Sequence, residues 1–223
     1  MTAKLFFEAI IKFLLGVVLV GVLIFLPAGT FAFLGGWILM GILFIPMFLA
    51  GLVMMVKKPS LLASRLEAKE KEKKQSMVVK ISELMFIVGF VLAGLDFRFS
   101  WIYLPFAVNV GASIVFIIAY LIYAEVLREN TYLSRTIKVV EGQKVISTGL
   151  YGIVRHPMYF ATILLFMSMP LVLGSLVSFV VFLAYPFIIA ARIKNEEKVL
   201  SRELEGYEEY KKKVKFRMIP FIW

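Results

Sequence analysis

The chain has 223 residues, of which 61% are hydrophobic and 18% charged, and its formal net charge at pH 7 is +10. Soluble domains are about 45–50% apolar and about 25% charged, and disordered chains are poor in aromatic and aliphatic residues, so this composition excludes both classes. There is no cysteine and one histidine, His156, which excludes a disulfide framework, a thiolate nucleophile and a Cys- or His-rich metal centre. A basic and strongly apolar chain favours a membrane protein with basic faces over a nucleic-acid binder, and we expect neither a metal nor a nucleic-acid partner.

Six apolar segments are predicted to cross a membrane, because a spanning helix needs about 20 largely apolar residues. The first four are residues 5–27, 30–56, 77–95 and 101–127. The last apolar tract, residues 158–191, is too long for one crossing. It contains Pro170 and Gly174-Ser175, so we expect a hairpin of two short helices that breaks there. The predicted fold is therefore an all-α polytopic integral membrane protein with about six transmembrane helices.

Basic residues gather on one side of this topology. The connecting segments at 57–76 and 128–157 carry seven and five Lys or Arg, and the tail from Arg192 carries nine. The opposite side has only Arg98, close to Asp96. Positive charge marks the cytoplasmic side, so we expect a multi-pass protein of the cell membrane with both termini in the cytoplasm. Within loop 57–76, Leu61, Leu62 and Leu66 predict a short helix that lies on the membrane surface.

Almost all chemically capable groups follow residue 128. We therefore divide one structural domain into the helices of residues 1–127 and a motif region of residues 128–223. In that region, residues 143–151 lead into Arg155-His156-Pro157-Met158-Tyr159. Proline favours the first turn of a helix, so His156 is predicted to cap a helix that Pro157 begins. The free N–H groups of that turn could bind an anionic ligand group, or the cluster could simply anchor the helix at the membrane interface.

A second polar group lies where the hairpin ends. Arg192 and Glu196 are four residues apart, so they share a helix face. We expect this helix to continue into the cytosol as a C-terminal helix with an apolar stripe at Ile193, Leu200, Leu204 and Tyr207. The pair could be an ordinary surface ion pair worth about 0–1 kcal/mol. Alternatively, the two charges could face the mouth of a site, where arginine can hold an anion bidentately.

Several short motifs occur together in a fixed order. The set comprises Gly149-Leu150-Tyr151, Arg155-His156-Pro157-Met158-Tyr159, Gly174-Ser175, Arg192 with Glu196-Glu197, Gly206-Tyr207-Glu208-Glu209-Tyr210 and Arg217-Met218-Ile219-Pro220, with Lys58-Pro59-Ser60-Leu61-Leu62 earlier in the chain. This set resembles the isoprenylcysteine carboxyl methyltransferase family in its broad sense, which includes phospholipid methyltransferase-like integral membrane enzymes, and it resembles the prokaryotic members most. Leu150 stands where proline is common in the family, and Ala161 stands where glycine often follows.

The resemblance implies an S-adenosyl-L-methionine-dependent methyltransferase with its cofactor site at the cytosolic face. The residues it implies for cofactor binding are Gln143, Lys144, Val145, Ile146, Tyr151, His156, Pro157, Met158, Tyr159 and Glu196. It implies that Arg192 binds the substrate, and we expect Arg192 and Glu197 to be the catalytic residues. The expected partners are membrane lipids and a lipid-like acceptor, with no obligate protein partner.

The sequence leaves the reaction open. A carboxylate acceptor is already ionised and needs no strong base, so catalysis would rest on positioning and the exclusion of water. A phospholipid-headgroup amine would need a proton acceptor, for which Glu197 and His156 are candidates. An NADPH-dependent membrane sterol-type reductase and a small transporter are the alternatives from other classes.

Overall fold

A computed structural model of the protein describes residues 3–66, 73–134, 136–137 and 139–223. Throughout these ranges the regular elements are helical, which confirms the predicted all-α class. They are α1 (Ala3–Ala28), α2 (Leu34–Lys57), α3 (Pro59–Leu66), α4 (Lys73–Phe99), α5 (Phe106–Glu129), the 3-10 helix η1 (Gly149–Gly152), α6 (Pro157–Val172), α7 (Leu176–Phe182), α8 (Tyr185–Glu203) and α9 (Tyr207–Lys213).

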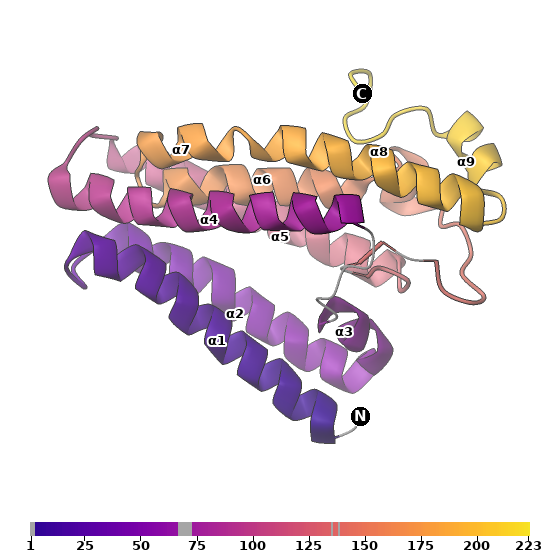
Figure 1. Ribbon diagram of the computed structural model, residues 1–223, viewed down its shortest axis with the longest axis horizontal. Helices are drawn as coiled ribbons and strands as arrows, with labels where there is room; N and C mark the ends of the chain where they lie inside the picture. The colour runs from indigo at the N-terminus through magenta and orange to yellow at the C-terminus, as the bar shows by residue number, and fades with distance from the viewer. Residues whose placement is uncertain (1–2, 67–72, 135, 138) are drawn as a thin grey trace.

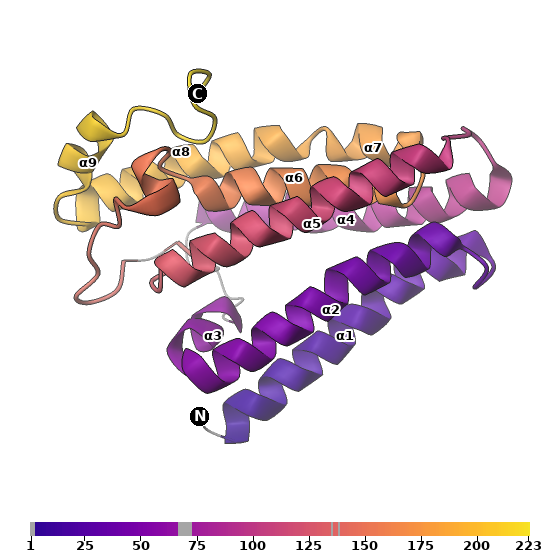
Figure 2. The ribbon, with the colours of Figure 1, turned by 180° about the vertical axis from the view of Figure 1, so that it is seen from behind.

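The long helices form one elongated bundle. Helices α4, α5, α6 and the α7–α8 arm run side by side, and the α1–α2 hairpin diverges from them (Figures 1 and 2). The N terminus, α3 and α9 lie toward one end of the bundle, whereas the α1–α2 and α4–α5 turns lie at the other (Figure 1). The C-terminal tail returns from α9 alongside α8, so both termini lie on the side of α3 and α9.

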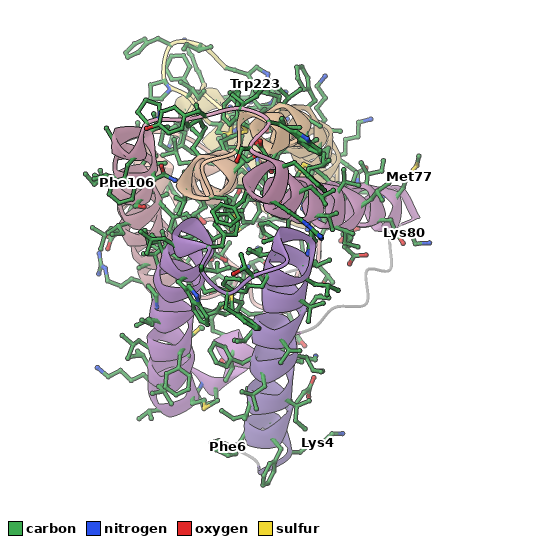
Figure 3. The ribbon with its side chains drawn as sticks, turned by 90° about the vertical axis from the view of Figure 1, so that its left-hand side faces the viewer. Lys4, Phe6, Met77, Lys80, Phe106 and Trp223 are labelled. Atoms are coloured by element: carbon green, nitrogen blue, oxygen red, sulfur yellow. The ribbon has the colours of Figure 1, made fainter. Side chains whose placement is uncertain are left out.

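The outer surface of the bundle is apolar. Among the described residues, five helical segments are long and apolar enough to cross a membrane, one of them being α7 and α8 together, while α6 is apolar but has only 16 residues. Large apolar side chains point outward from α1 and α2 (Figure 3), and Phe7, Leu15 and Val18 each expose about three-fifths of their area. Water would be a poor solvent for such faces, so the structure supports the predicted membrane protein.

Helix α4 is longer than the predicted segment 77–95 and includes Asp96 and Arg98, which we had expected in a loop. Asp96 is 3% exposed. Its carboxylate accepts hydrogen bonds from Ser175 Oγ at 2.6 Å and from the backbone N–H of Ile102 at 3.1 Å. These donors offset the cost of burying the charge and join the α4–α5 turn to the α6–α7 turn.

The predicted hairpin is present, and its break occurs at Gly174-Ser175. Gly174 has a φ of +75°, and Ser175 caps α7 by accepting a hydrogen bond from the N–H of Ser178 at 3.1 Å. The predicted break at Pro170 is wrong, because Pro170 lies within α6 near its C-terminal end. The second arm is divided into α7 and α8, because Pro186 has no N–H to continue the helical hydrogen bonds.

Two shorter helices differ in detail from the prediction. The helix expected in loop 57–76 is α3, but Leu61 and Leu62 are buried in the protein rather than laid on the membrane surface, and Leu62 packs with Ala9 and Met55. The stripe predicted on one C-terminal helix is divided, because α8 ends at Glu203 and Gly206, with a φ of +79°, precedes α9.

Candidate functional site

A pocket lies at the end of the bundle that carries α9. It encloses about 830 Å³ of space between side chains, a volume that includes its open mouth. Its walls come from the segment after α5, the start of α6, the second half of α8 and α9. The lining residues are Asn130, Tyr132, Leu133, Ser134, Thr136, Ile137, Gln143, Lys144, Val145, Ile146, Tyr151, Arg155, His156, Met158, Tyr159, Arg192, Glu196, Leu200, Leu204, Tyr207 and Tyr210.

The structure therefore brings together residues that the sequence singled out from distant segments. All the expected cofactor residues except Pro157 line this pocket, and so does Arg192. Pro157 instead occupies the first position of α6, with His156 as the N-cap, as the sequence predicted. Glu197 does not line the pocket. The roles of these residues remain predictions.

The C-terminal tail fixes the start of α6. The backbone N–H of Arg155 donates to Phe216 O at 3.0 Å, and that of His156 donates to Arg217 O at 2.7 Å. These two hydrogen bonds hold residues 155–156 against the tail immediately before the helix begins. The side chain of His156 is consequently positioned by a segment about 60 residues further along the chain.

Tyr159 joins the two charged residues of α8 that line the pocket. Its hydroxyl accepts a hydrogen bond from Arg192 Nε at 2.9 Å and donates one to Glu196 Oε2. Arg192 and Glu196 do share a face, as their spacing predicted, and the Tyr159 phenol lies between them. A cation, a phenol and a carboxylate are thus held together in the pocket wall.

Glu197 lies on the neighbouring face of α8, where its side chain is 6% exposed. Its carboxylate accepts hydrogen bonds from Arg155 Nε at 2.7 Å and Arg217 Nε at 2.8 Å, and it lies 3.3 Å from His156 Nε2. Two guanidinium groups stabilise the ionised carboxylate and make it a poor proton acceptor. The catalytic role expected of Glu197 stays a prediction, and these contacts add a second one, that Glu197 positions Arg155 and His156.

Five tyrosines line the pocket: Tyr132, Tyr151, Tyr159, Tyr207 and Tyr210. Three of them, Tyr151, Tyr207 and Tyr210, lie outside the Arg192–Tyr159–Glu196 group. Tyr151 OH accepts a hydrogen bond from Asn130 Nδ2 at 3.1 Å, and Tyr210 OH donates to Tyr151 O at 2.7 Å. Burial raises the pKa of Tyr151, Tyr207 and Tyr210, so all three remain neutral phenols near pH 7. Neutral tyrosine rings offer π faces that attract cations.

Three residues that line the pocket, Tyr207, Tyr210 and Asn130, were not predicted from the sequence to belong to the site. The first two belong to the motif at residues 206–210, which was a signal that the site includes this segment. Residues 132–134 and 136–137 also line the pocket. They carry no recognisable motif, and only the three-dimensional fold shows their position.

Glycine is required at residue 149 because the side chain of Glu129 approaches its Cα closely. Its φ is +49°, and a Cβ atom at this position would lie 2.3 Å from Glu129 Oε1. That carboxylate oxygen accepts a hydrogen bond from Thr148 Oγ1 at 2.8 Å. A side chain at residue 149 would therefore displace Glu129 or the turn that carries Tyr151.

Comparison with known proteins finds two similarities. The model of the isoprenylcysteine carboxyl methyltransferase (ICMT) family matches residues 109–202, which run from α5 to the end of α8. The mouse Delta(14)-sterol reductase TM7SF2 is 28% identical over 91 residues. That similarity covers 40% of this chain but 22% of the reductase, so the chain spans about a fifth of the length of this relative.

Proposed function

We propose that the chain, which the model of the isoprenylcysteine carboxyl methyltransferase family matches over residues 109–202, is an integral membrane methyltransferase of this family that uses S-adenosylmethionine as methyl donor. The pocket is the main support for this proposal. Residues 143–146, Tyr151, His156, Met158, Tyr159 and Glu196 come from separate segments and meet in one cavity.

The chemistry of the pocket fits this cofactor. When bound, S-adenosylmethionine supplies a methyl group carried on a positively charged sulfur. The faces of Tyr151, Tyr207 and Tyr210 suit such a cation. In the first turn of α6, Pro157 has no N–H, and the N–H groups of Tyr159 and Phe160 donate to His156 O. The N–H of Met158 is then the group of this turn that would bind a carboxylate, and Glu196 can accept hydrogen bonds from hydroxyl groups.

We propose that the acceptor is a carboxylate on a lipid-like molecule. A carboxylate is already ionised, so the protein has to orient it and exclude water rather than remove a proton. Arg192 would hold the anionic group. The surroundings of Glu197 support this choice, because both candidate bases for amine methylation, Glu197 and His156, belong to one buried cluster with Arg155.

A methyl-transfer assay tests the proposal. The purified protein is placed in bilayers with methyl-labelled S-adenosylmethionine and with either a prenylcysteine or a total membrane lipid extract. We expect label in the organic phase that alkali releases as methanol, as a methyl ester requires. Alkali-stable label would indicate amine methylation and contradict the carboxylate acceptor.

We also propose six membrane crossings with both termini cytoplasmic. Helices α3 and α9 lie toward one end of the bundle with both termini (Figure 1), and residues of α9 line the pocket. Helix α6 would be a short sixth crossing. Reporter fusions after Ser60, Phe97 and Trp223 test this topology. Position 97 should lie opposite the other two, and finding it on the side of either would contradict the proposal.

Similarity to the mouse Delta(14)-sterol reductase favours a second candidate, a nicotinamide-dependent reductase that uses the same pocket. The reductase hypothesis predicts specific binding of NADPH and no binding of S-adenosylhomocysteine. The methyltransferase hypothesis predicts binding of S-adenosylhomocysteine and no specific binding of NADPH, so direct binding measurements distinguish the two.

A further inference from the structure

A second groove, of about 990 Å³ including its wide open mouth, runs along the other face of α8. Its α8 cations are Lys194, Lys198 and Arg202, and Lys211 of α9 and Arg217 of the tail complete its basic lining. Lys194 and Lys198 are each offset by two residues from the pocket residues Arg192 and Glu196. Two residues correspond to about 200° around a helix, so α8 separates this groove from the pocket.

The groove carries an excess of positive charge. Five cations line it against two carboxylates, Glu197 and Glu208, which leaves a net charge of 5 − 2 = +3. Both carboxylates are already engaged: Glu197 is bound by Arg155 and Arg217, and Glu208 pairs with Lys211 at 3.1 Å. These pairs occupy Arg217 and Lys211, and the two carboxylates lining the groove are not available to Lys194 or Lys198.

The three cations of α8 also repel one another. Lys194, Lys198 and Arg202 follow at intervals of four residues, and like charges at this spacing destabilise a helix. Arg202 pairs with Glu203, whereas across the described part of the chain no ion pair joins Lys194 or Lys198 to a carboxylate. An anion in the groove would relieve this repulsion.

Apolar side chains adjoin the groove on the side of the tail. The ring of Phe216, next to Arg217 in the chain, contacts that of Phe221 at 5.1 Å between centroids. Phe221 is 89% exposed and Ile222 is 77% exposed, although the tail itself is folded, since Trp223 O accepts three backbone hydrogen bonds. A cationic groove beside an exposed apolar tip matches a molecule with an anionic head and a hydrocarbon tail.

We propose that the groove binds the phosphate of an anionic phospholipid from the cytoplasmic leaflet, with Lys194, Lys198 and Arg202 as its main contacts. Phe221 and Ile222 would then lie among the acyl chains at the membrane surface. This assignment rests on the proposed topology, which places the end of α8 at the cytoplasmic headgroups, and it does not depend on methyl transfer.

Native mass spectrometry of the full chain, released from bilayers of phosphatidylglycerol and phosphatidylcholine in equal amounts, tests the assignment. The wild-type protein should retain phosphatidylglycerol preferentially. Each cation removed near an anionic surface should reduce this preference about fivefold. The triple variant Lys194→Gln/Lys198→Gln/Arg202→Gln should therefore show a preference about a hundredfold lower. If this variant does not fold, Lys198→Glu alone should still reduce the preference at least fivefold.

A matched control variant distinguishes a specific lipid site from general electrostatic attraction between the basic protein and anionic lipids. Lys4→Gln/Lys57→Gln/Lys80→Gln removes the same charge from exposed positions outside the groove and should keep the preference. Equal retention of both lipids by the wild type, or equal losses in the two triple variants, would overturn the proposal. Displacement of the lipid by millimolar inorganic phosphate would also overturn it, because the site would then recognise phosphate without its lipid. S-adenosylhomocysteine affinity should be the same in both triple variants, so failure here is distinguishable from failure of the methyltransferase assignment.

Discussion

Replacing Glu197 with glutamine tests the buried cluster that supports the pocket. Glutamine has nearly the same size, and its one oxygen can still accept from Arg155, but its NH2 group would face the Nε–H of Arg217, which lies 2.8 Å from the carboxylate. Arg217 is 34% exposed at its side chain and can turn to water, whereas Arg155 is 6% exposed and would keep a buried, unpaired charge. Breaking one partner of a buried ion pair costs about 3–5 kcal/mol. Because Arg155 retains hydrogen bonds to Val214 O and Lys215 O, we expect a loss near the lower limit, about 3 kcal/mol.

Equilibrium unfolding by sodium dodecyl sulfate in mixed micelles measures this loss. The matched control is Glu208→Gln, which removes a carboxylate from an exposed pair with Lys211 and should cost about 0–1 kcal/mol. Glu197→Gln should also weaken S-adenosylhomocysteine binding, since Arg155 and His156 line the pocket. A loss of stability equal to that of Glu208→Gln would refute the positioning role.

Four further substitutions test the pocket and the turn that carries Tyr151. Arg192→Lys keeps the charge but loses the planar fork, so methyl transfer should fall more than tenfold while S-adenosylhomocysteine affinity stays nearly normal; near-wild-type turnover, or equal loss in both assays, would contradict an acceptor role. His156→Ala and Glu196→Ala should each weaken S-adenosylhomocysteine binding by roughly 1–3 kcal/mol in calorimetry, and unchanged affinity in both would exclude this site. Gly149→Ala should destabilise the protein by about 1 kcal/mol or more, and adding Glu129→Ala should recover part of the loss by removing the clash.

The sequence predicted the helices well because their lengths and apolar content are set locally by the bilayer. It also predicted the start of α6 at Pro157 and the hairpin break at Gly174-Ser175, since proline and glycine restrict the backbone independently of the rest of the fold. The end of α4 was missed because Asp96 looks like a loop residue in the sequence. Only its contact with Ser175, 79 residues away, makes its burial in a helix acceptable.

The site was predictable as a set of residues but not as an arrangement. Motif order indicated which side chains belong together, and spacing put Arg192 and Glu196 on one face. The bridge through Tyr159 and the binding of Glu197 by Arg155 and Arg217 depend on contacts between segments that are distant in the chain. Such contacts leave no periodic pattern in the sequence, so they could not be predicted from it.

The methyltransferase assignment depends on binding of S-adenosylmethionine in the pocket between α6, α8 and α9. Isothermal titration calorimetry on the purified, detergent-solubilised protein measures this binding, with S-adenosylhomocysteine and NADPH titrated in turn against the wild type and Glu196→Ala. We expect saturable binding of S-adenosylhomocysteine that Glu196→Ala weakens, and no specific binding of NADPH. Saturable binding of NADPH with none of S-adenosylhomocysteine would contradict the methyltransferase assignment and favour the reductase.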